Sequence, residues 1–93
     1  MAKVKVEFSS RFKSMYSLVL QKNLHSRSEI DKRISWFAKN SLDTRLRNHP
    51  LKKRMKGKWA FSITDDIRIV YIWKSKNTVR FLAIGPHIEV YKK

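Results

Sequence analysis

The stretch KWAFSITDDIRIVYIWKSKNTVRFLAI, residues 58–84, decides the fold. Apolar and polar side chains alternate along it in three runs, and this period of two is typical of β-strands. Two polar segments, residues 64–66 and 74–77, separate the runs and predict turns. The middle run, from Ile67 to Trp73, is apolar on both faces, so we expect it to be the central strand of the sheet.

The stretch GPHIEVY follows as residues 85–91. Gly85 and Pro86 are expected to end the third strand, because both residues interrupt regular structure. Beyond them lies a short final segment with a histidine and a tyrosine four residues apart. If this segment is extended, His87 and Tyr91 lie on one face of it.

Two amphipathic helices are expected before the sheet. Ser9 or Ser10 can cap the first helix, and Asn23 is expected to terminate it. Ser26 precedes Glu29 by three residues, which is the spacing of a capping box for the second helix. Each helix carries one apolar stripe at helical spacing, formed by Phe12, Met15, Tyr16, Val19 and Leu20 in the first and by Ile30, Ile34, Phe37 and Ala38 in the second. The short break between the helices predicts an antiparallel helical hairpin.

Residues 3–8, KVKVEF, alternate charged and apolar side chains and predict a further strand at the N-terminus. The apolar stripes of the hairpin need a partner, which the sheet supplies. We therefore expect an α+β domain, in which the N-terminal strand and the antiparallel helical hairpin pack on one face of a mainly antiparallel β-sheet of about four strands. A chain of 93 residues has the length of one domain, so residues 1–93 are expected to form a single unit.

The charge of the chain is its strongest global feature. Twenty-two Lys and Arg residues stand against seven Asp and Glu, which gives a net charge of +15. Such an excess destabilises a small compact domain by self-repulsion, and its usual reason is a polyanionic partner, either nucleic acid or an acidic protein. A solvated basic surface kept for solubility is the alternative. The chain has no signal-peptide pattern and no apolar run near the roughly 20 residues that span a bilayer, so we expect a cytoplasmic protein with no membrane partner.

Residues 41–57, SLDTRLRNHPLKKRMKG, connect the second helix to the sheet. Loops above about 12–15 residues are uncommon in compact domains and tend to be functional. This one contains no acid after Asp43. Its basic residues are Arg45, Arg47, Lys52, Lys53, Arg54 and Lys56, with Lys58 directly beyond it. This local concentration of cations predicts that the loop forms a phosphate-binding edge of the domain.

Several kinds of catalytic site have no support in the sequence. Cysteine is absent, which leaves no thiolate ligand and no disulfide. The acids are scattered, the three histidines show no ligand spacing, and neither a glycine-rich phosphate loop nor a Gly-x-Ser-x-Gly motif occurs. We therefore expect neither a metal nor a small-molecule cofactor.

A reaction that remains is metal-free cleavage of RNA, whose 2′-hydroxyl is a nucleophile within the substrate. Such a site needs a base for that hydroxyl, a cation for the crowded phosphorane and an acid for the leaving 5′-oxygen. Arg68 lies in the apolar central strand, where it either pairs with Asp66 or Glu89 or faces a site. His49, in the basic loop before Pro50, is either a turn residue or an acid–base group.

Four motifs in this order carry a resemblance to a known family: HPL at residues 49–51, KGKW at 56–59, DxRIVY at 66–71 and IGPHxEVY at 84–91. Together they resemble the RelE/YafQ/ParE superfamily of bacterial toxins from toxin–antitoxin pairs, and the RelE and YafQ branches most of all. The resemblance covers residues 49–91, and the N-terminal half agrees with it as an architecture. It implies a RelE-like fold and a ribosome-dependent, metal-independent mRNA endoribonuclease that inhibits translation.

The resemblance also implies roles for individual residues. His87 would be the general acid, Arg68 would stabilise the phosphorane, and His49 or Asp66 would be the base. Tyr91 would orient or stack a nucleobase near the cleaved bond. The RNA or ribosomal RNA backbone would be bound by Lys52, Lys53, Arg54, Lys56 and Lys58.

Two positions depart from the family pattern: Ser62 stands where some YafQ-like members have a histidine, and Pro86 replaces the commoner threonine. The resemblance implies an acidic antitoxin as partner, whose helix or extended segment covers the site or the helical hairpin. Two other functions stay open. ParE-like relatives inhibit DNA gyrase without cutting RNA, and a plain basic domain would bind nucleic acid only.

Overall fold

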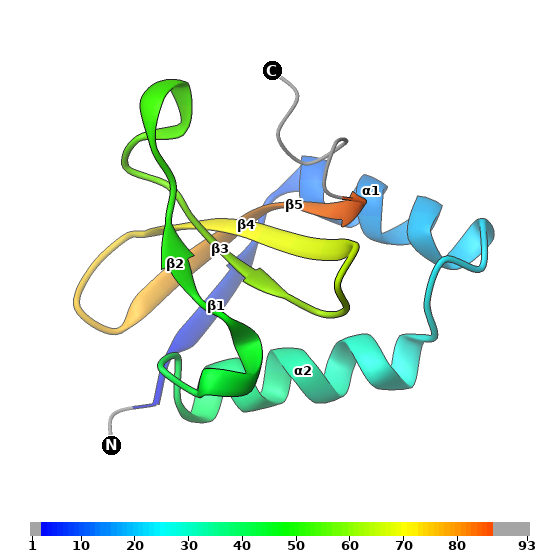
Figure 1. The fold of residues 1–93 in the computed structure, drawn as a ribbon, viewed down its shortest axis with the longest axis horizontal. Coiled ribbons are helices and arrows are strands. Elements are labelled where there is room, and N and C mark those ends of the chain that lie inside the picture. Colours follow the sequence, from blue (N-terminus) through cyan, green and yellow to red (C-terminus); the bar gives the residue numbers. More distant parts are fainter. Residues whose placement is uncertain (1–2, 87–93) are drawn as a thin grey trace.

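The computed structural model describes residues 3–86 as two α-helices, five β-strands and two short 3-10 turns (Figure 1). In chain order these elements are β1 (Lys5–Phe8), α1 (Ser10–Gln21), α2 (Arg27–Lys39), η1 (Thr44–Leu46), β2 (His49–Pro50), η2 (Lys53–Met55), β3 (Trp59–Ser62), β4 (Ile67–Trp73) and β5 (Thr78–Pro86). The two helices pack on one mixed sheet, so the predicted α+β class is confirmed.

The strands of the sheet follow the order β1-β5-β4-β3-β2. β1 runs parallel to β5, and the other three neighbouring pairs are antiparallel. β4 therefore lies in the middle, as its apolar residues on both faces predicted. The sheet has a fifth strand because His49 and Pro50 pair with Ala60 and Trp59. Two residues are too few for an alternating pattern to be visible in the sequence.

The helices begin where their caps predicted. The Ser9 hydroxyl accepts a hydrogen bond from the Phe12 N–H at 3.0 Å, and the Ser26 hydroxyl accepts one from the Glu29 N–H at 3.3 Å. Asn23 follows α1 with a φ of 54°, in the left-handed region that commonly ends helices. The two helices run in opposite directions, which confirms the helical hairpin (Figure 1).

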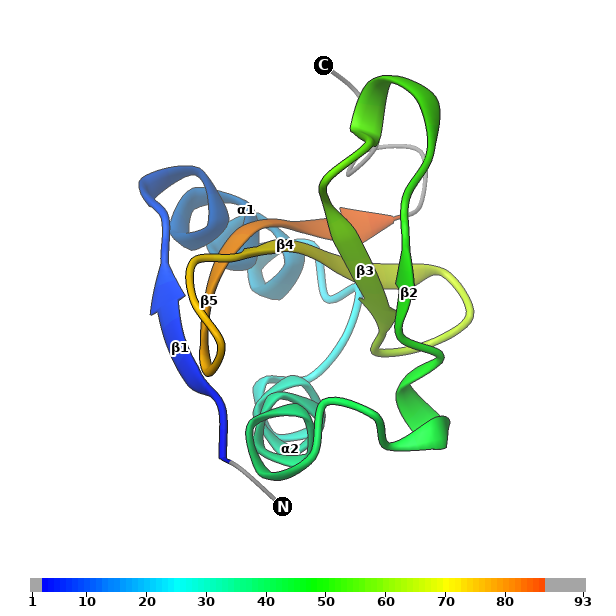
Figure 2. The same cartoon turned by 90° about the vertical axis from the view of Figure 1, so that its left-hand side faces the viewer.

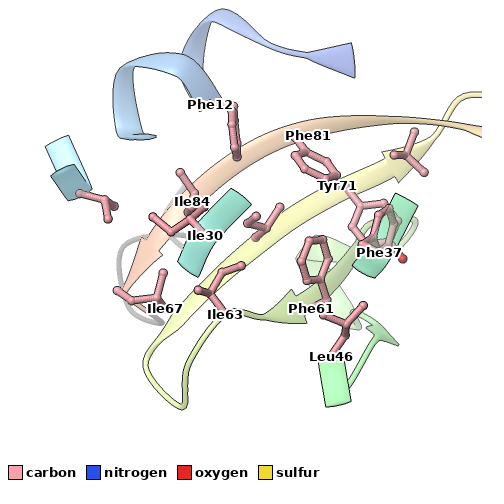
Figure 3. Packing of buried hydrophobic residues seen from close by; sticks show 13 residues of the cluster. Phe12, Ile30, Phe37, Leu46, Phe61, Ile63, Ile67, Tyr71, Phe81 and Ile84 are labelled. Atoms are coloured by element: carbon pink, nitrogen blue, oxygen red, sulfur yellow. The ribbon is translucent and has the colours of Figure 1, made fainter. Parts of the chain in front are cut away.

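The main core lies between the helices and one face of the sheet (Figure 3). The ring of Phe37 in α2 stacks on that of Phe61 in β3, with 4.5 Å between centroids. Its edge meets the rings of Tyr71 and Phe81. From α1, Phe12 lies 5.3 Å from Phe81. Burying one such side chain contributes about 1.5–3 kcal/mol, so these rings hold the hairpin on the sheet.

The central strand β4 shows different residues to the two faces of the sheet. Ile67, Ile69 and Tyr71 belong to the helical core. Because side chains alternate along a strand, Arg68 and Val70 point to the opposite face. We call this opposite face the loop face, and its residues in the three central strands include Ala60, Ser62, Arg68, Val70 and Ala83.

A bulge in the ladder between β4 and β5 changes which residues of β5 point to each face of the sheet. Val70 pairs with Ala83 but Tyr71 pairs with Phe81, so β5 has one extra residue. Ala83 can therefore join Val70 on the loop face, while Phe81 and Ile84, three positions apart, both reach the core. Small residues on the loop face leave room for the connecting loop to pack there.

The connection between α2 and β3 is more ordered than predicted. Residues 41–57 were expected to form one long loop, but they contain η1, β2 and η2. The side chain of Leu46 is fully buried. The hydroxyl of Tyr71 donates to Asn48 Oδ1 at 2.6 Å, which ties the connection to the centre of the sheet.

The end of β5 also differs from the prediction. Gly85 and Pro86 were expected to end the third strand, whereas both residues continue it. Pro86 pairs with Ile67 at the last position of the ladder. A proline is tolerated there because the end of a strand makes few demands on its missing N–H. Within residues 3–86, no helix is long and apolar enough to cross a membrane.

Candidate nucleic-acid site

Arg68 occupies the centre of the loop face. In the ladder it lies opposite Ser62 on β3 and Gly85 on β5. Its Nη1 donates to Ser62 Oγ at 3.2 Å and its Nη2 to the Asp65 carbonyl at 3.2 Å, while its buried Nε has no partner among the described residues. No ion pair with Asp66 forms there. The other predicted partner, Glu89, lies outside the described residues. Within residues 3–86, the arginine is held by two neutral acceptors that leave its charge uncompensated.

His49 lies on the same face of the sheet as Arg68. It pairs with Ala60, and directly opposed residues of antiparallel strands share a face. β2 is two strands away from β4, a separation of roughly 10 Å. The ring Nδ1 lies 2.8 Å from the Arg47 carbonyl. Since a carbonyl only accepts, Nδ1 carries the proton, and Nε2 of the neutral ring is left as an acceptor.

The basic connection between β2 and β3 folds over the loop face. Leu51 and Met55 pack on the cluster of small residues formed there by Ala60, Val70 and Ala83. Figure 2 shows this connection rising from the sheet at the edge opposite β1. Its cations are exposed apart from the half-buried Lys58, and within residues 3–86 none of them forms an ion pair: Lys52, Lys53, Arg54, Lys56 and Lys58.

Asp66 is less well placed than the sequence implied. It is exposed in the turn between β3 and β4, and its backbone N–H bonds to the Thr64 hydroxyl at 3.2 Å. Its neighbour Asp65 makes the contacts instead. The Asp65 carbonyl accepts from Arg68, and the Asp65 carboxylate pairs with Arg47 at 3.2 Å.

The two remaining predicted site residues, His87 and Tyr91, lie outside the described residues. Their roles stay predictions from the sequence. In residues 3–86, no group of three or more His, Asp or Glu side chains lies close enough to hold a metal ion. What the structure brings together on the loop face is Arg68, His49 and the cationic connection.

Ser62 is a functional candidate that sequence reasoning passed over as a departure from a pattern. Its side chain is 5% exposed, and it faces the guanidinium of Arg68 across the ladder. The signal was present in the alternation of β3, since a polar Ser62 falls two residues after Ala60 on the same face. Only the pairing of β3 with β4 shows that this polar residue lies opposite Arg68.

A groove lies at the other edge of the molecule, between β1, α1 and α2. It has a volume of about 670 Å³. At its side the Tyr16 hydroxyl donates to Asp31 Oδ1 at 2.8 Å, and the guanidinium of Arg27 lies 5.7 Å above the Tyr16 ring. The groove is lined mainly by apolar side chains, among them Val4, Val6, Phe12, Leu20, Ile34 and Ala38. Such a concave apolar surface next to an edge strand can receive a segment of another protein.

Comparison with known proteins identifies the family. Residues 4–92 match the family described as the YafQ bacterial toxin of type II toxin–antitoxin systems. The chain belongs to this family. The match confirms the resemblance that the motifs in residues 49–91 carried, and it makes the chain a toxin of a type II toxin–antitoxin system. No sequence among curated proteins matches the chain.

Solved structures of YafQ and related toxins share the fold. YafQ from E. coli strain BL21(DE3) superposes with a TM-score of 0.80 at 20% identity, over 97% of this chain and 100% of that one. The toxin in the E. coli DinJ–YafQ toxin–antitoxin complex gives 0.78 at 20% identity, over 97% and 99%. A copper-bound mutant toxin from Helicobacter pylori gives 0.78 at 24% identity, over 95% and 99%. These similarities confirm the RelE-like architecture of this YafQ-family chain.

Proposed function

We propose that this YafQ-family toxin is a ribosome-dependent, metal-independent endoribonuclease that cleaves mRNA and thereby inhibits translation. The observation that carries the proposal is the loop face, where Arg68 and His49 share one side of the sheet with a cationic connection packed over it. The resemblance to the RelE and YafQ branches supports the same reaction.

The reaction on RNA needs no group beyond the substrate and the side chains. The 2′-oxygen attacks the phosphorus and the bond to the 5′-oxygen breaks, which leaves a 2′,3′-cyclic phosphate and a 5′-hydroxyl. The base removes the proton of the 2′-hydroxyl, and the acid protonates the departing 5′-oxygen. His49 suits the base because its Nδ1 is engaged by the Arg47 carbonyl, which leaves Nε2 as an acceptor without a hydrogen bond in residues 3–86. Asp66 is the alternative base, and it is exposed in the turn before β4.

Cations on the loop face supply the electrostatic part of the mechanism. Arg68 stabilises the charge that develops on the phosphorane oxygens, and its planar fork suits them. The exposed cations of the connection hold the backbone of the message or of ribosomal RNA. His87 as the general acid and Tyr91 as the residue that stacks on a nucleobase complete the proposal, on the strength of the resemblance.

The proposed reaction is tested with translating ribosomes in a buffer that keeps the Mg²⁺ on which ribosomes depend and contains a chelator selective for transition metals. Wild-type protein should cut the message, and Arg68→Ala should lower the cleavage rate by roughly 100-fold. Arg11→Ala is the matched control, because Arg11 is exposed on α1. If the transition-metal chelator abolishes cleavage, or if Arg68→Ala cuts as well as the wild type, the proposal is wrong.

A gyrase supercoiling assay on the same preparation separates the other two functions. An intact message together with blocked supercoiling would identify a ParE-like gyrase inhibitor. An intact message, unaffected gyrase and retained RNA binding would identify a plain nucleic-acid-binding domain. Our proposal expects cut message and unaffected supercoiling.

An acidic antitoxin is the partner that the family and the charge imply for this toxin. The E. coli relative is known in complex with DinJ. We propose that an apolar segment of the antitoxin occupies the groove between β1, α1 and α2, while its acidic residues meet the cations at the rim. Lys13 and Arg27 supply such cations. Complementary charge favours rapid association.

The groove is tested with the product of the neighbouring open reading frame, co-purified with the toxin. Ala38→Arg places a long cation in the groove and should weaken binding more than 10-fold. Lys39→Ala, on the next residue of α2, should leave it nearly unchanged. Equal affinity of the Ala38→Arg variant and the wild type would show that the antitoxin binds elsewhere.

A further inference from the structure

Ser62 has an unusual place for a serine. It lies in β3 between the buried residues Phe61 and Ile63, and apart from the phenol of Tyr71 its side chain is the one polar side chain of a buried residue in residues 3–86. A hydroxyl that is buried without a hydrogen bond costs free energy. The partner of Ser62 is Arg68 Nη1, at 3.2 Å. The hydrogen bond from the arginine opposite it therefore offsets the cost of burying the serine hydroxyl.

The two contacts of Arg68 fix the direction of its guanidinium. Ser62 Oγ on β3 holds Nη1, and the carbonyl of Asp65 in the preceding turn holds Nη2. Each terminal nitrogen carries two N–H groups, so one N–H on each is left for another acceptor. A free arginine side chain loses rotamer entropy when it is ordered. A guanidinium ordered before the substrate arrives avoids much of that loss during the reaction.

We propose that Ser62 is a positioning residue, whose hydroxyl aims the guanidinium of Arg68 at the phosphate on the loop face. This inference rests on the proposed function, because the phosphate is that of the cleaved RNA. Ser62 does not touch the substrate, since its side chain is 5% exposed beneath the arginine. Its effect passes through Arg68 alone.

The test compares cleavage of message on translating ribosomes by the wild type and by variants of Ser62. Ser62→Ala should lower kcat about 10-fold and change KM less than about twofold, because it loosens a group that acts in the transition state. Ser62→Thr retains the hydroxyl and should restore most of kcat. Ser62→Cys keeps the size but offers only a weak acceptor, so its kcat should stay low. Ser75→Ala, in the exposed turn after β4, is the matched control.

A second comparison uses the variant Arg68→Ala as background. Adding Ser62→Ala to it should cause no further loss of kcat, because the serine acts only through the arginine. A further loss in the double variant, or an unchanged kcat in Ser62→Ala while Arg68→Ala is inactive, would overturn the positioning role. Wild-type protein that leaves the message intact would overturn the proposed function, and this role with it. Thermal unfolding of every variant shows which losses come from folding.

Discussion

Arg68 shows how a single residue in the middle of a sheet is made ready for an anion. It lies between Ile67 and Ile69, where a cation costs free energy unless it is hydrogen-bonded. The serine hydroxyl and the main-chain carbonyl that hold it are neutral, so its positive charge stays uncompensated within residues 3–86. A carboxylate in the place of Ser62 would neutralise that charge. The neutral pair orients the guanidinium and does not neutralise its charge.

At the residue scale, we predict that His49 is the base of the reaction. His49→Ala should reduce cleavage of ribosome-bound message by roughly 100-fold, because proton abstraction from the 2′-hydroxyl is lost. His25→Ala serves as control, since His25 lies in the break between α1 and α2. If His49→Ala cuts normally and Asp66→Asn does not, the base is the aspartate.

A second prediction at this scale concerns Tyr16 and alkaline pH. Burial, together with the hydrogen bond to Asp31, raises the pKa of Tyr16 from 10.0 to about 12. The folded protein thus favours the neutral phenol. The resulting stabilisation is complete below pH 10 and is lost as the pH rises to about 12. Urea unfolding should show wild type more stable than Tyr16→Phe at neutral pH, with the difference vanishing over this range. A difference in stability between the two proteins that stays constant with pH would contradict this prediction.

At the scale of elements, the sequence predicted those parts whose signals are local. Ser9 and Ser26 cap the helices as expected, because a cap depends on residues three positions apart. The alternation of Ile67 to Trp73 predicted the central strand. The short strand His49–Pro50 and the order within residues 41–57 were missed, because they depend on pairing with β3 and on the buried Leu46.

The hydrogen bond between Tyr71 and Asn48 links two elements and gives a testable prediction. Tyr71→Phe keeps the ring in the core but leaves Asn48 Oδ1 without its donor. We expect a loss of about 1 kcal/mol, which lowers Tm by about 4–8 °C in a domain of this size. Amide hydrogen exchange in residues 44–58 should become faster, because the connection loses its tie to the sheet. An unchanged exchange rate there would show that other contacts hold the connection.

At the scale of the whole molecule, the described ion pairs do little to balance the charge of +15. In residues 3–86 two pairs form, Arg45 with Asp43 and Arg47 with Asp65. The hydrogen bonds from Arg45 lower the pKa of Asp43 to about 2, so its carboxylate stays charged at any physiological pH. Most other cations in residues 3–86 are exposed and form no ion pair there.

This distribution of charge predicts a strong salt dependence of RNA binding. Each Lys or Arg that contacts a phosphate contributes about −0.7 to the slope of log K against log salt for a single strand. Lys53→Ala and Arg54→Ala should each make the slope shallower by about that amount. Lys39→Ala, at the end of α2, should not. The slope is measured with a single-stranded RNA oligonucleotide over a series of KCl concentrations, and equal slopes for all three variants would contradict the prediction.

The sequence indicated which residues are candidates for the site better than it indicated how they are arranged. Motifs in the sequence singled out Arg68, His49 and the cations of the connection, and the structure places them around the loop face. The part played by Ser62 and Asp65 was not visible, because it arises from the register of β3 with β4. The register depends on the packing of the whole sheet, and the sequence of a single strand does not determine it.

The parallel pairing of β1 with β5 has a consequence for folding during synthesis. The first strand to leave the ribosome finds its neighbour only in the last strand of the sheet, more than seventy residues later in the register from Lys5 to Thr78. Contacts between distant parts of a chain form late in folding. The sheet of the nascent chain should therefore stay incomplete until β5 has been synthesised.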